Sequence, residues 1–358
     1  MKLLILQPFI TNYRLPIFNE LCDDYQVAIA ASISSSYGQV DIDDFDGEVF
    51  YELPHKSYFK ERILFQEGVL RTLFKVSPDV VFVSANPRYL SLWVLLLLCK
   101  LKNIKVILHG QGLYNKDSIS YAHRCMFGLL NFLSDRYVCY TESCRKSLES
   151  LRIHSKAEVC ENSIVNVNSI ERTCTGEKGI LFIGRLRNGC GIELLINAVE
   201  KINAKGENIT LYVVGGGGLL DSLKEIYSGK SNICFTGAIY DAAVISELSK
   251  KCFVGCYPGD AGLSILHYMS MSLPPIAHMN MRAHMGPEPS YIIPGINGLL
   301  FERGDIESLV EAILFARSNS EQWAGMMECA YKTYVDLTVP SLGQRIKLII
   351  NDVLKRDV

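Results

Sequence analysis

The residues best suited to chemistry lie between positions 252 and 278, where the sequence predicts a phosphate-binding loop. An apolar strand, Cys252–Cys256, is followed by a Pro-Gly turn and by a glycine-containing loop that opens directly into a helix. This order of elements directs backbone N–H groups and the positive end of a helix at one point, which suits a phosphate group. Three side chains that could assist binding lie in or beside this loop: Asp260, Ser264 and His267.

A second phosphate-binding segment is predicted around Arg185. The strand Gly179–Ile183 ends in Gly184 and Arg185, and a glycine-bearing loop then leads into a helix from Ile192. Arginine provides fixed bidentate donors for a diphosphate, and the helix end adds partial positive charge. Taken alone, this segment is better explained by an ordinary surface turn. The first loop, at the carboxyl end of the same predicted sheet, favours a binding role.

Two further glycine turns follow strands in the same half of the chain. Gly215–Gly218 end one strand and precede a helix, and Gly237 ends the next strand shortly before Tyr240. Glycines permit close approach of a ligand to the backbone. Since the run is not a GxGxxG in a first strand unit, a dinucleotide site is only weakly indicated. We expect the turn at Gly237 to hold a nucleobase through main-chain groups.

Apolar strands alternate with amphipathic helices along the whole chain, which predicts parallel sheets with helices on both faces. The strands are expected at Lys2–Leu6, Gln26–Ala31, Val80–Ser84, Lys105–Leu108, Arg136–Tyr140 and Ala157–Cys160, then at Gly179–Ile183, Ile209–Val214, Ile233–Phe235, Cys252–Cys256 and Pro275–His278. Helices are expected at Tyr13–Cys22, Gln66–Val76, Ser143–Leu151, Ile192–Lys205, Gly218–Ser228 and Asp241–Lys250.

Two such series predict two doubly wound domains. The break falls in the polar stretch Val167–Lys178, which has no apolar periodicity. We therefore expect a first domain over residues 1–167 and a second over 168–340. A last helix, within 341–358, is expected to cross back to the first domain.

The composition describes a well-packed protein and excludes one class of partner. Of 358 residues, 49% are hydrophobic and 21% charged, and the formal net charge is −2. Without a basic excess, nucleic acid is not expected as a partner. The twelve cysteines form no CxxC pair, which favours reduced core thiols in the cytosol over disulfides or a metal site.

Three features bear on membrane contact. The N-terminus reads as a first buried strand and not as a signal peptide. The apolar stretch Tyr89–Cys99 is too short to span a bilayer. It is predicted to form a buried helix packed on a sheet. The less favoured alternative is a helix that touches lipid, with Lys100, Lys102 and Lys105 beside it. A basic and apolar stretch could likewise face a membrane, although an amphipathic helix is favoured. Its basic residues are Lys56, Lys60, Arg62, Arg71 and Lys75.

The order and spacing of several segments resemble the group-1 (family 4) retaining glycosyltransferases. These segments are FIGRL, VVGGGG, FTGAIYD, YPGDAGLSILH and PSYIIPGINGLLF, over about Gly179–Leu309, with looser matches in QPFITNYRLPIFNEL and VILHGQGLYN. The resemblance implies the α/β fold called GT-B, in which two facing Rossmann-like domains border an interdomain cleft. It also implies a nucleotide-sugar on the second domain, a glycan acceptor on the first, and no metal or other cofactor.

Carried onto this chain, the resemblance implies site residues in both halves. His109, Arg185 and Asp260 are the expected catalytic residues, with Arg185 on the donor diphosphate and His109 near the donor sugar. Tyr13 and Arg14 are expected to contact the acceptor, although a surface Arg at a helix start is nearly as good an interpretation. The expected donor-binding residues are Gly184, Arg185, Gly215, Gly237, Tyr240, Gly259, Gly262, Leu263, Ser264, His267 and Glu288.

Three positions depart from the family's pattern. Cys190 replaces a lysine that contacts the diphosphate, and Gly259 and His267 replace two glutamates. One explanation is a variant donor loop, in which Asp260 or Glu288 contacts sugar hydroxyls and His267 donates to phosphate or ribose. The downstream segment that contains His278, Asn280, His284 and Glu288 resembles that variant too. The other explanation is lost activity.

The sequence therefore predicts a glycosyltransferase that uses a nucleoside-diphosphate donor and a glycan acceptor in surface polysaccharide biosynthesis. A lipid-linked acceptor is expected. We expect it in the cytoplasm, with peripheral contact to the cytoplasmic face of the inner membrane left open. Two alternatives remain: a degenerate partner subunit that binds a nucleotide-sugar, and a nucleotide-sugar epimerase. The D-x-D spacings in Asp41–Glu48 are better explained by a solvated acidic loop than by a metal site.

Overall fold

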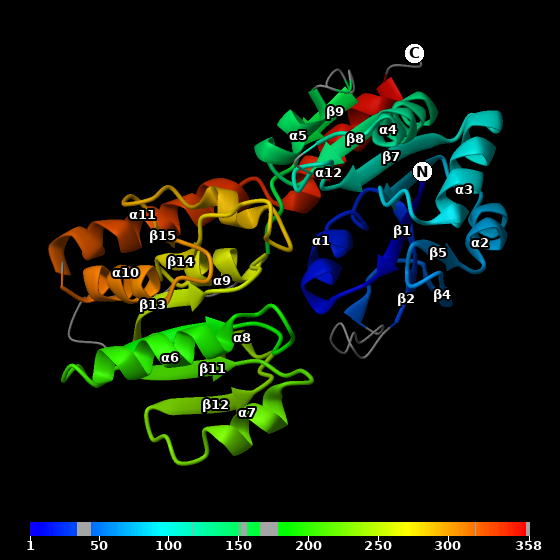
Figure 1. Ribbon diagram of the computed structural model, residues 1–358. Helices are drawn as coiled ribbons and strands as arrows, with labels where there is room; N and C mark the ends of the chain where they lie inside the picture. The colour runs from blue at the N-terminus through cyan, green and yellow to red at the C-terminus, as the bar shows by residue number, and fades with distance from the viewer. Residues whose placement is uncertain are drawn as a thin grey trace. The chain divides into compact units, whose positions relative to one another are not determined.

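The computed structural model describes residues 1–33, 44–116, 118–149, 151, 156–164, 178–318 and 320–355. The chain divides into two compact units, an N-terminal unit of Met1–Val165 with Val339–Val358, and a C-terminal unit of Asn166–Thr338. Each unit contains a parallel sheet with helices on both faces (Figure 1). The predicted α/β fold class is confirmed. Of the predicted break at Val167–Lys178, all but Lys178 lies outside the described residues.

The N-terminal unit is built on a seven-stranded sheet in the order β3-β2-β1-β6-β7-β8-β9, in which every pairing is parallel. Its strands are β1 (Lys2–Phe9), β2 (Gln26–Ser32), β3 (Val49–Glu52), β6 (Val80–Ser84), β7 (Lys105–Gly110), β8 (Arg136–Cys139) and β9 (Ala157–Val159). A separate antiparallel hairpin joins β4 (His55–Tyr58) to β5 (Ile63–Gln66).

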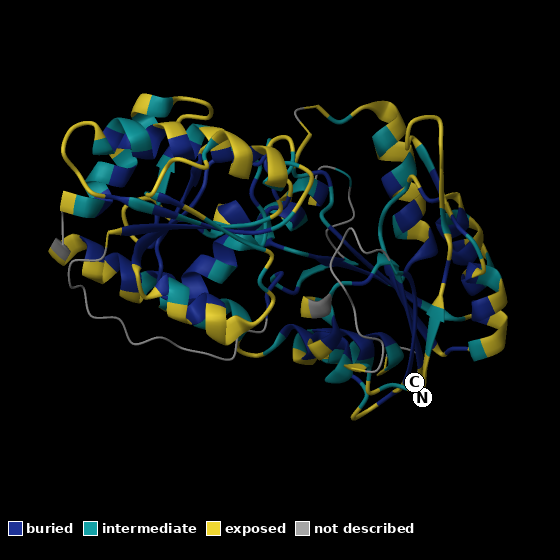
Figure 2. Cartoon of the chain, turned by 90° about the horizontal axis from the view of Figure 1, so that it is seen from below, coloured by how far each residue is buried: buried dark blue, intermediate teal, exposed yellow. Residues whose placement is uncertain are grey.

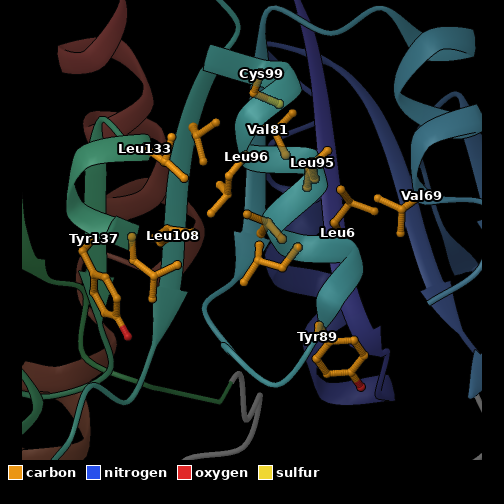
Figure 3. Close-up of a cluster of buried hydrophobic side chains, with 14 of the residues drawn as sticks. Leu6, Val69, Val81, Tyr89, Leu95, Leu96, Cys99, Leu108, Leu133 and Tyr137 are labelled. Carbon is orange, nitrogen blue, oxygen red and sulfur yellow. The ribbon is translucent and has the colours of Figure 1, made fainter. Parts of the chain in front are cut away.

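Helices cover both faces of this sheet. One apolar cluster joins the sheet to α2 (Val69–Val76), α3 (Leu90–Leu101), α4 (Tyr121–Leu133) and α5 (Glu142–Glu149). Figure 3 shows Leu95, Leu96 and Cys99 of α3 among the buried side chains of this cluster, with Val81 and Leu108 from the strands. The opposite cluster contains the turn η1 (Asn12–Arg14), α1 (Leu15–Asn19) and α12 (Leu342–Lys355). The last helix of the chain therefore packs in the core of the N-terminal unit.

The C-terminal unit has a six-stranded parallel sheet in the order β12-β11-β10-β13-β14-β15. Its strands are β10 (Gly179–Ile183), β11 (Thr210–Val214), β12 (Ile233–Gly237), β13 (Cys252–Tyr257), β14 (Pro275–His278) and β15 (Leu299–Phe301). Its helices are α6 (Ile192–Asn203), α7 (Leu220–Ile226), α8 (Ala242–Ser249), α9 (Ser264–Ser270), η5 (Glu288–Tyr291), α10 (Ile306–Ser318) and α11 (Ser320–Thr338).

The strand order of the C-terminal sheet reverses between β10 and β13. Strands β11 and β12 extend from one side of β10, whereas β13, β14 and β15 follow on its other side. In parallel sheets, ligands bind outside the carboxyl ends of the strands at such a switch point. Both phosphate-binding segments predicted from the sequence begin at this point, one after β10 and one after β13.

Four short strands were not predicted: β3, β4, β5 and β15. They have three or four residues each, and most are partly exposed, so they lack the long apolar run that marks a buried parallel strand. The amphipathic-helix interpretation of the basic stretch is wrong for its first part. Lys56 lies in β4, and Lys60 and Arg62 lie between the two strands of the hairpin, whereas Arg71 and Lys75 do lie on α2.

Helix α3 packs on the sheet as predicted, but the expectation that it is buried is wrong for its outer side. Leu92, Leu95 and Leu96 are buried, whereas Leu97 and Leu101 are exposed. Figure 2 shows this division, with buried residues along the sheets and exposed residues on the outer sides of the helices. Among the described residues, no helix combines the length and apolar character needed to cross a membrane. The described cysteines are free thiols.

Candidate functional site

The carboxyl end of β10 presents an arginine at the switch point. Gly184 follows the strand and donates its N–H to the carbonyl of Val214 (3.0 Å), and Leu186 donates to Gly216 (2.9 Å). Between these two bonds lies Arg185, whose side chain is exposed. A Cβ atom on Gly215 would overlap the carbonyl of Gly184, so the close approach of these two turns requires glycine. The structure thus brings Gly184, Arg185 and Gly215 together.

The next turn along the same edge contains the residues predicted to hold a base. Gly215 donates its N–H to the carbonyl of Gly237 (2.8 Å), which connects the ends of β11 and β12. Gly237 has a positive φ of 79°, a conformation that glycine adopts without steric cost. Tyr240, three residues further on, is 71% exposed. An accessible aromatic ring therefore lies shortly after this turn in the sequence.

Two of the three family departures, at positions 190 and 259, lie in contact through their backbones. Gly259 donates its N–H to the carbonyl of Cys190 (3.2 Å), and Asp260 donates to that of Gly189 (2.9 Å). A Cβ atom on Gly259 would overlap the backbone of Gly189 and Cys190. Cys190 itself is buried. The loop after β10 therefore occupies the place where a glutamate at 259 would begin, and the side chain at 190 faces the interior.

Ala261 is fixed on both sides by the segment that follows β14. Its N–H donates to Nδ1 of His284 (3.1 Å), and its carbonyl accepts from the N–H groups of Met285 (3.0 Å) and Gly286 (3.2 Å). Nε2 of His284 donates to the carbonyl of His278 (2.9 Å). Burial, and after it the neighbouring His278, lowers the pKa of His284 to about 4. A neutral His284 thus clamps the loop through both ring nitrogens.

These contacts narrow the part of the loop that can bind a phosphate. The N–H groups of Gly259, Asp260 and Ala261 already donate to protein acceptors. These three N–H groups are therefore already engaged and are not available to a phosphate. The N–H groups of Gly262, Leu263 and Ser264 remain as candidates, at the start of α9, where the first turn of a helix lacks intrahelical acceptors.

The carboxylate of Asp260 is held by an arginine that the sequence reasoning missed. Nη2 of Arg303, in the turn after β15, donates to Oδ1 of Asp260 (2.9 Å). Nε2 of the fully buried His278 lies 3.6 Å from the same oxygen, and the imidazole ring of His278 stacks on that of His284 with centroids 3.7 Å apart. Arg303 could have been identified from its position just after a short apolar strand, which is also the position of Arg185.

Glu288 and His267 border the same loop. Glu288 is only 2% exposed, and a Cβ atom on Gly262 would lie 3.6 Å from its Oε2, so its carboxylate lies beside the loop. His267 belongs to the last turn of α9. Burial lowers the pKa of His267 to about 4, so its imidazole is neutral at pH 7 and offers one N–H donor instead of a cation.

The N-terminal unit brings its own predicted residues together. His109 lies in β7, is buried, and packs against Tyr140 with ring centroids 4.5 Å apart. The guanidinium of Arg14 lies 5.8 Å from the ring centroid of Tyr140 and 5.5 Å from that of Tyr13; Arg14 also donates to the side chain of Asn162. Burial, with Arg14 as a second cause, lowers the pKa of His109 well below its usual value. His109 is therefore a neutral group.

A pocket that the sequence did not indicate lies in the same unit. It has a volume of about 680 Å³, at the ends of β1, β2 and β6 and against the unpredicted hairpin β4–β5. Among its lining side chains are Glu52, His55, Asn86 and Arg88. The ring of His55 also lies against that of Phe9, with centroids 5.0 Å apart. Within the described ranges, no group of three or more His, Cys, Asp or Glu residues is arranged to hold a metal ion.

Comparison with known proteins identifies the class of this fold and site. Residues 177–319 match the sequence family described as "Glycosyl transferases group 1". The C-terminal unit is therefore a group-1 glycosyl transferase domain, and the chain has the GT-B fold. The family resemblance predicted from the sequence is confirmed.

Individual relatives agree with this class. The chain is 29% identical over 214 residues to the O-antigen biosynthesis glycosyltransferase WbnH of Escherichia coli, and the match covers 58% of this chain and 60% of WbnH. The crystal structure of Anabaena Alr3699/HepE in complex with UDP superposes with a TM-score of 0.74 at 14% identity, over 98% of this chain and 100% of HepE. The lipopolysaccharide outer core galactosyltransferase WaaB gives a TM-score of 0.62 at 13% identity, over 94% of this chain and 99% of WaaB.

Proposed function

We propose that this chain is a retaining glycosyltransferase that moves a sugar from a nucleoside-diphosphate donor to a glycan acceptor in surface polysaccharide biosynthesis. The observation that carries the proposal is the switch point of a group-1 domain, where the loop that begins with the exposed Arg185 contacts a second loop, which is clamped by His284. WbnH is an O-antigen glycosyltransferase by its name, and HepE has been crystallised with UDP and with UDP-glucose. These relatives support a nucleotide-sugar donor for this chain.

The described residues suggest how the reaction would be assisted. Arg185 and the N–H groups at the start of α9 would stabilise the diphosphate as it leaves, since preorganised donors act most strongly where charge develops. Asp260 and Glu288 would accept hydrogen bonds from sugar hydroxyls, and neutral His267 would donate to phosphate or ribose. The acceptor hydroxyl would attack from the face that the diphosphate leaves.

The acceptor side of the proposal rests on the N-terminal unit. Tyr13 and Arg14 would contact the acceptor, and His109 would orient the donor sugar or the leaving oxygen. The pocket beside the hairpin offers carboxylate, amide, guanidinium and imidazole groups, which suit the hydroxyls of a glycan. We propose a lipid-linked acceptor and a cytoplasmic location with peripheral contact to the inner membrane. The reaction is proposed to need no metal or cofactor.

The degenerate-subunit alternative depended on the three departures from the family's pattern. Because a Cβ atom on Gly259 would overlap the backbone of Gly189 and Cys190, the glycine at 259 fits the path of the neighbouring loop and need not indicate decay. We therefore favour a variant donor site over an inactive one. An epimerase is not favoured.

Thermal-shift measurements with UDP-, GDP- and dTDP-sugars, with and without EDTA, would test the proposal. A ligand at 100 times its dissociation constant stabilises a protein by about 2.7 kcal/mol, so a true donor should raise the melting temperature in both conditions. The donor that does so is then tested for sugar transfer or slow hydrolysis. Absence of a shift with every donor would overturn the enzyme proposal, and a shift abolished by EDTA would overturn metal independence.

A further inference from the structure

Helix α3 carries an apolar stripe on the side that faces away from the sheet. Leu90, Val94, Leu97 and Leu101 are 50%, 44%, 52% and 82% exposed. Their spacing of four, three and four residues places them along one face of the helix. Because the opposite side of α3 already supplies the core, as Figure 3 shows for Leu95, Leu96 and Cys99, folding of the unit does not account for this second apolar face.

The stripe continues onto the neighbouring helices at the carboxyl end of α3. Phe74 of α2 and Phe132 of α4 are 54% and 65% exposed. Nζ of Lys102 lies 5.2 Å from the ring centroid of Phe74, and Nζ of Lys100 lies 5.7 Å from that of Phe132. Each of the two lysines thus lies over an aromatic ring of one flanking helix. We call the exposed side chains of Phe74, Leu97, Lys100, Leu101, Lys102 and Phe132 the α3 surface.

The helices around the α3 surface have a different charge balance from the chain as a whole. Helices α2, α3 and α4, together with Lys102, contain no Asp or Glu. Their cationic residues are Arg71, Lys75, Lys100, Lys102 and Arg124. The whole chain has a formal net charge of −2, so this concentration of cations is local. An exposed apolar patch with a basic border marks an interaction site, and its chemistry fits a partner that is both apolar and anionic.

We propose that the α3 surface docks the protein onto a bilayer that contains anionic phospholipid. Leu97, Leu101 and Phe132 would enter the boundary between headgroups and acyl chains, and Lys100 and Lys102 would stay at the headgroups, as long cationic side chains do. A two-fold dimer through the same patch is disfavoured, because it would bring each lysine pair against its own copy. The inference rests on the proposed function in one respect: a lipid-linked acceptor would be presented at that bilayer.

Flotation of the full-length protein with vesicles tests this proposal. Vesicles of phosphatidylcholine with 30% phosphatidylglycerol should bind the protein, and vesicles of phosphatidylcholine alone should bind it much more weakly. Each cation near an anionic surface contributes about fivefold to binding. The double variant Lys100→Gln/Lys102→Gln should therefore lower partitioning to the anionic vesicles roughly 25-fold. The triple variant Leu97→Ser/Leu101→Ser/Phe132→Ser should lower it at every lipid composition.

A matched control is Ile226→Ser, which removes a side chain that is 69% exposed on the C-terminal unit and should leave vesicle binding unchanged. Equal binding to both vesicle types, absence of binding, or loss of binding with the control variant would overturn the proposal. So would a dimer, seen by light scattering, that only the α3-surface variants dissociate. The melting-temperature shift with donor is measured on the same variants. It should persist, so a failure of donor binding and a failure of membrane docking give different results.

Discussion

Nη2 of Arg303 donates to Oδ1 of Asp260 at 2.9 Å, which ties the turn after β15 to the loop after β13. The two residues are far apart in the sequence, and Nε2 of His278 lies 3.6 Å from the same carboxylate oxygen. The arginine is about half exposed and the carboxylate about one quarter exposed. Such a pair contributes little to stability, so its more important effect is on the direction of the Asp260 carboxylate.

The first prediction separates these two effects. Arg303→Gln should weaken donor binding about tenfold, because Asp260 loses the contact that orients it toward the sugar. The free energy of unfolding should fall by no more than about 1 kcal/mol. Calorimetric titration with the donor and denaturant unfolding measure the two quantities. Arg303→Lys, which keeps the charge, should recover part of the affinity. A large loss of stability with unchanged affinity would show that the pair is structural.

The second prediction concerns the missing glutamate. Gly259→Glu restores the residue that family members carry, yet its Cβ would overlap the backbone of Gly189 and Cys190. We expect this variant to lose about 1–3 kcal/mol of stability, as overpacked sites do, and to gain no activity. Denaturant unfolding and a transfer assay check both points. Gly229→Ala is the control, because a Cβ there would meet no atom within 4 Å. A stable Gly259→Glu protein with higher activity would contradict the packing argument.

Local sequence patterns predicted the parts of this molecule that depend on local chemistry. The apolar runs of β6, β10 and β14 end in the structure at the predicted residues, because a strand buried on both faces needs a continuous apolar run. The hairpin β4–β5 was missed, since each strand has only four residues and those of β4 are exposed or half-buried and mostly polar. The backbone contact of Gly259 with Cys190 and the pairing of Arg303 with Asp260 connect residues far apart in sequence. No single-residue pattern marks such contacts.

The third prediction follows from the buried histidine clamp. The pKa of His284 falls from an ordinary 6.5 to about 4 on folding, so the unfolded chain binds more protons than the folded one between these values. The free energy of unfolding therefore has its full value above pH 6.5. It decreases as the pH falls toward 4, by up to 1.36 kcal/mol per pH unit. The C-terminal unit should therefore lose about 3 kcal/mol over this range from His284 alone.

Tryptophan fluorescence can follow the C-terminal unit separately. Trp323 is buried in that unit and donates to the carbonyl of Phe253 (2.8 Å), and Trp93, on α3, is the other tryptophan of the chain. In a Trp93→Phe background, the unfolding midpoint reported by Trp323 should fall between pH 6.5 and 4.5. Adding His284→Gln should reduce that dependence, with His123→Gln, on α4 of the other unit, as control. A pH dependence that His284→Gln leaves unchanged would contradict the clamp.

The fourth prediction tests the anion site at the end of β10. Arg185 is exposed and lies between two backbone hydrogen bonds that fix its position. Its removal should therefore affect the reaction more than the fold. Arg185→Ala should lower kcat/KM by about 100-fold or more, which is typical for the loss of one preorganised donor to a developing charge, with little change in melting temperature. Arg185→Lys should recover only part of the rate, because an ammonium group cannot form the bidentate pair.

The readout that distinguishes binding from transition-state stabilisation is the division between KM and kcat. If Arg185 holds the diphosphate equally in both states, Arg185→Ala raises KM and leaves kcat unchanged; if it acts on the leaving group, kcat falls as far as kcat/KM. We expect the second result, since charge on the diphosphate increases as the sugar departs. An Arg185→Ala enzyme with wild-type kcat and KM would show that the arginine belongs to an ordinary surface turn.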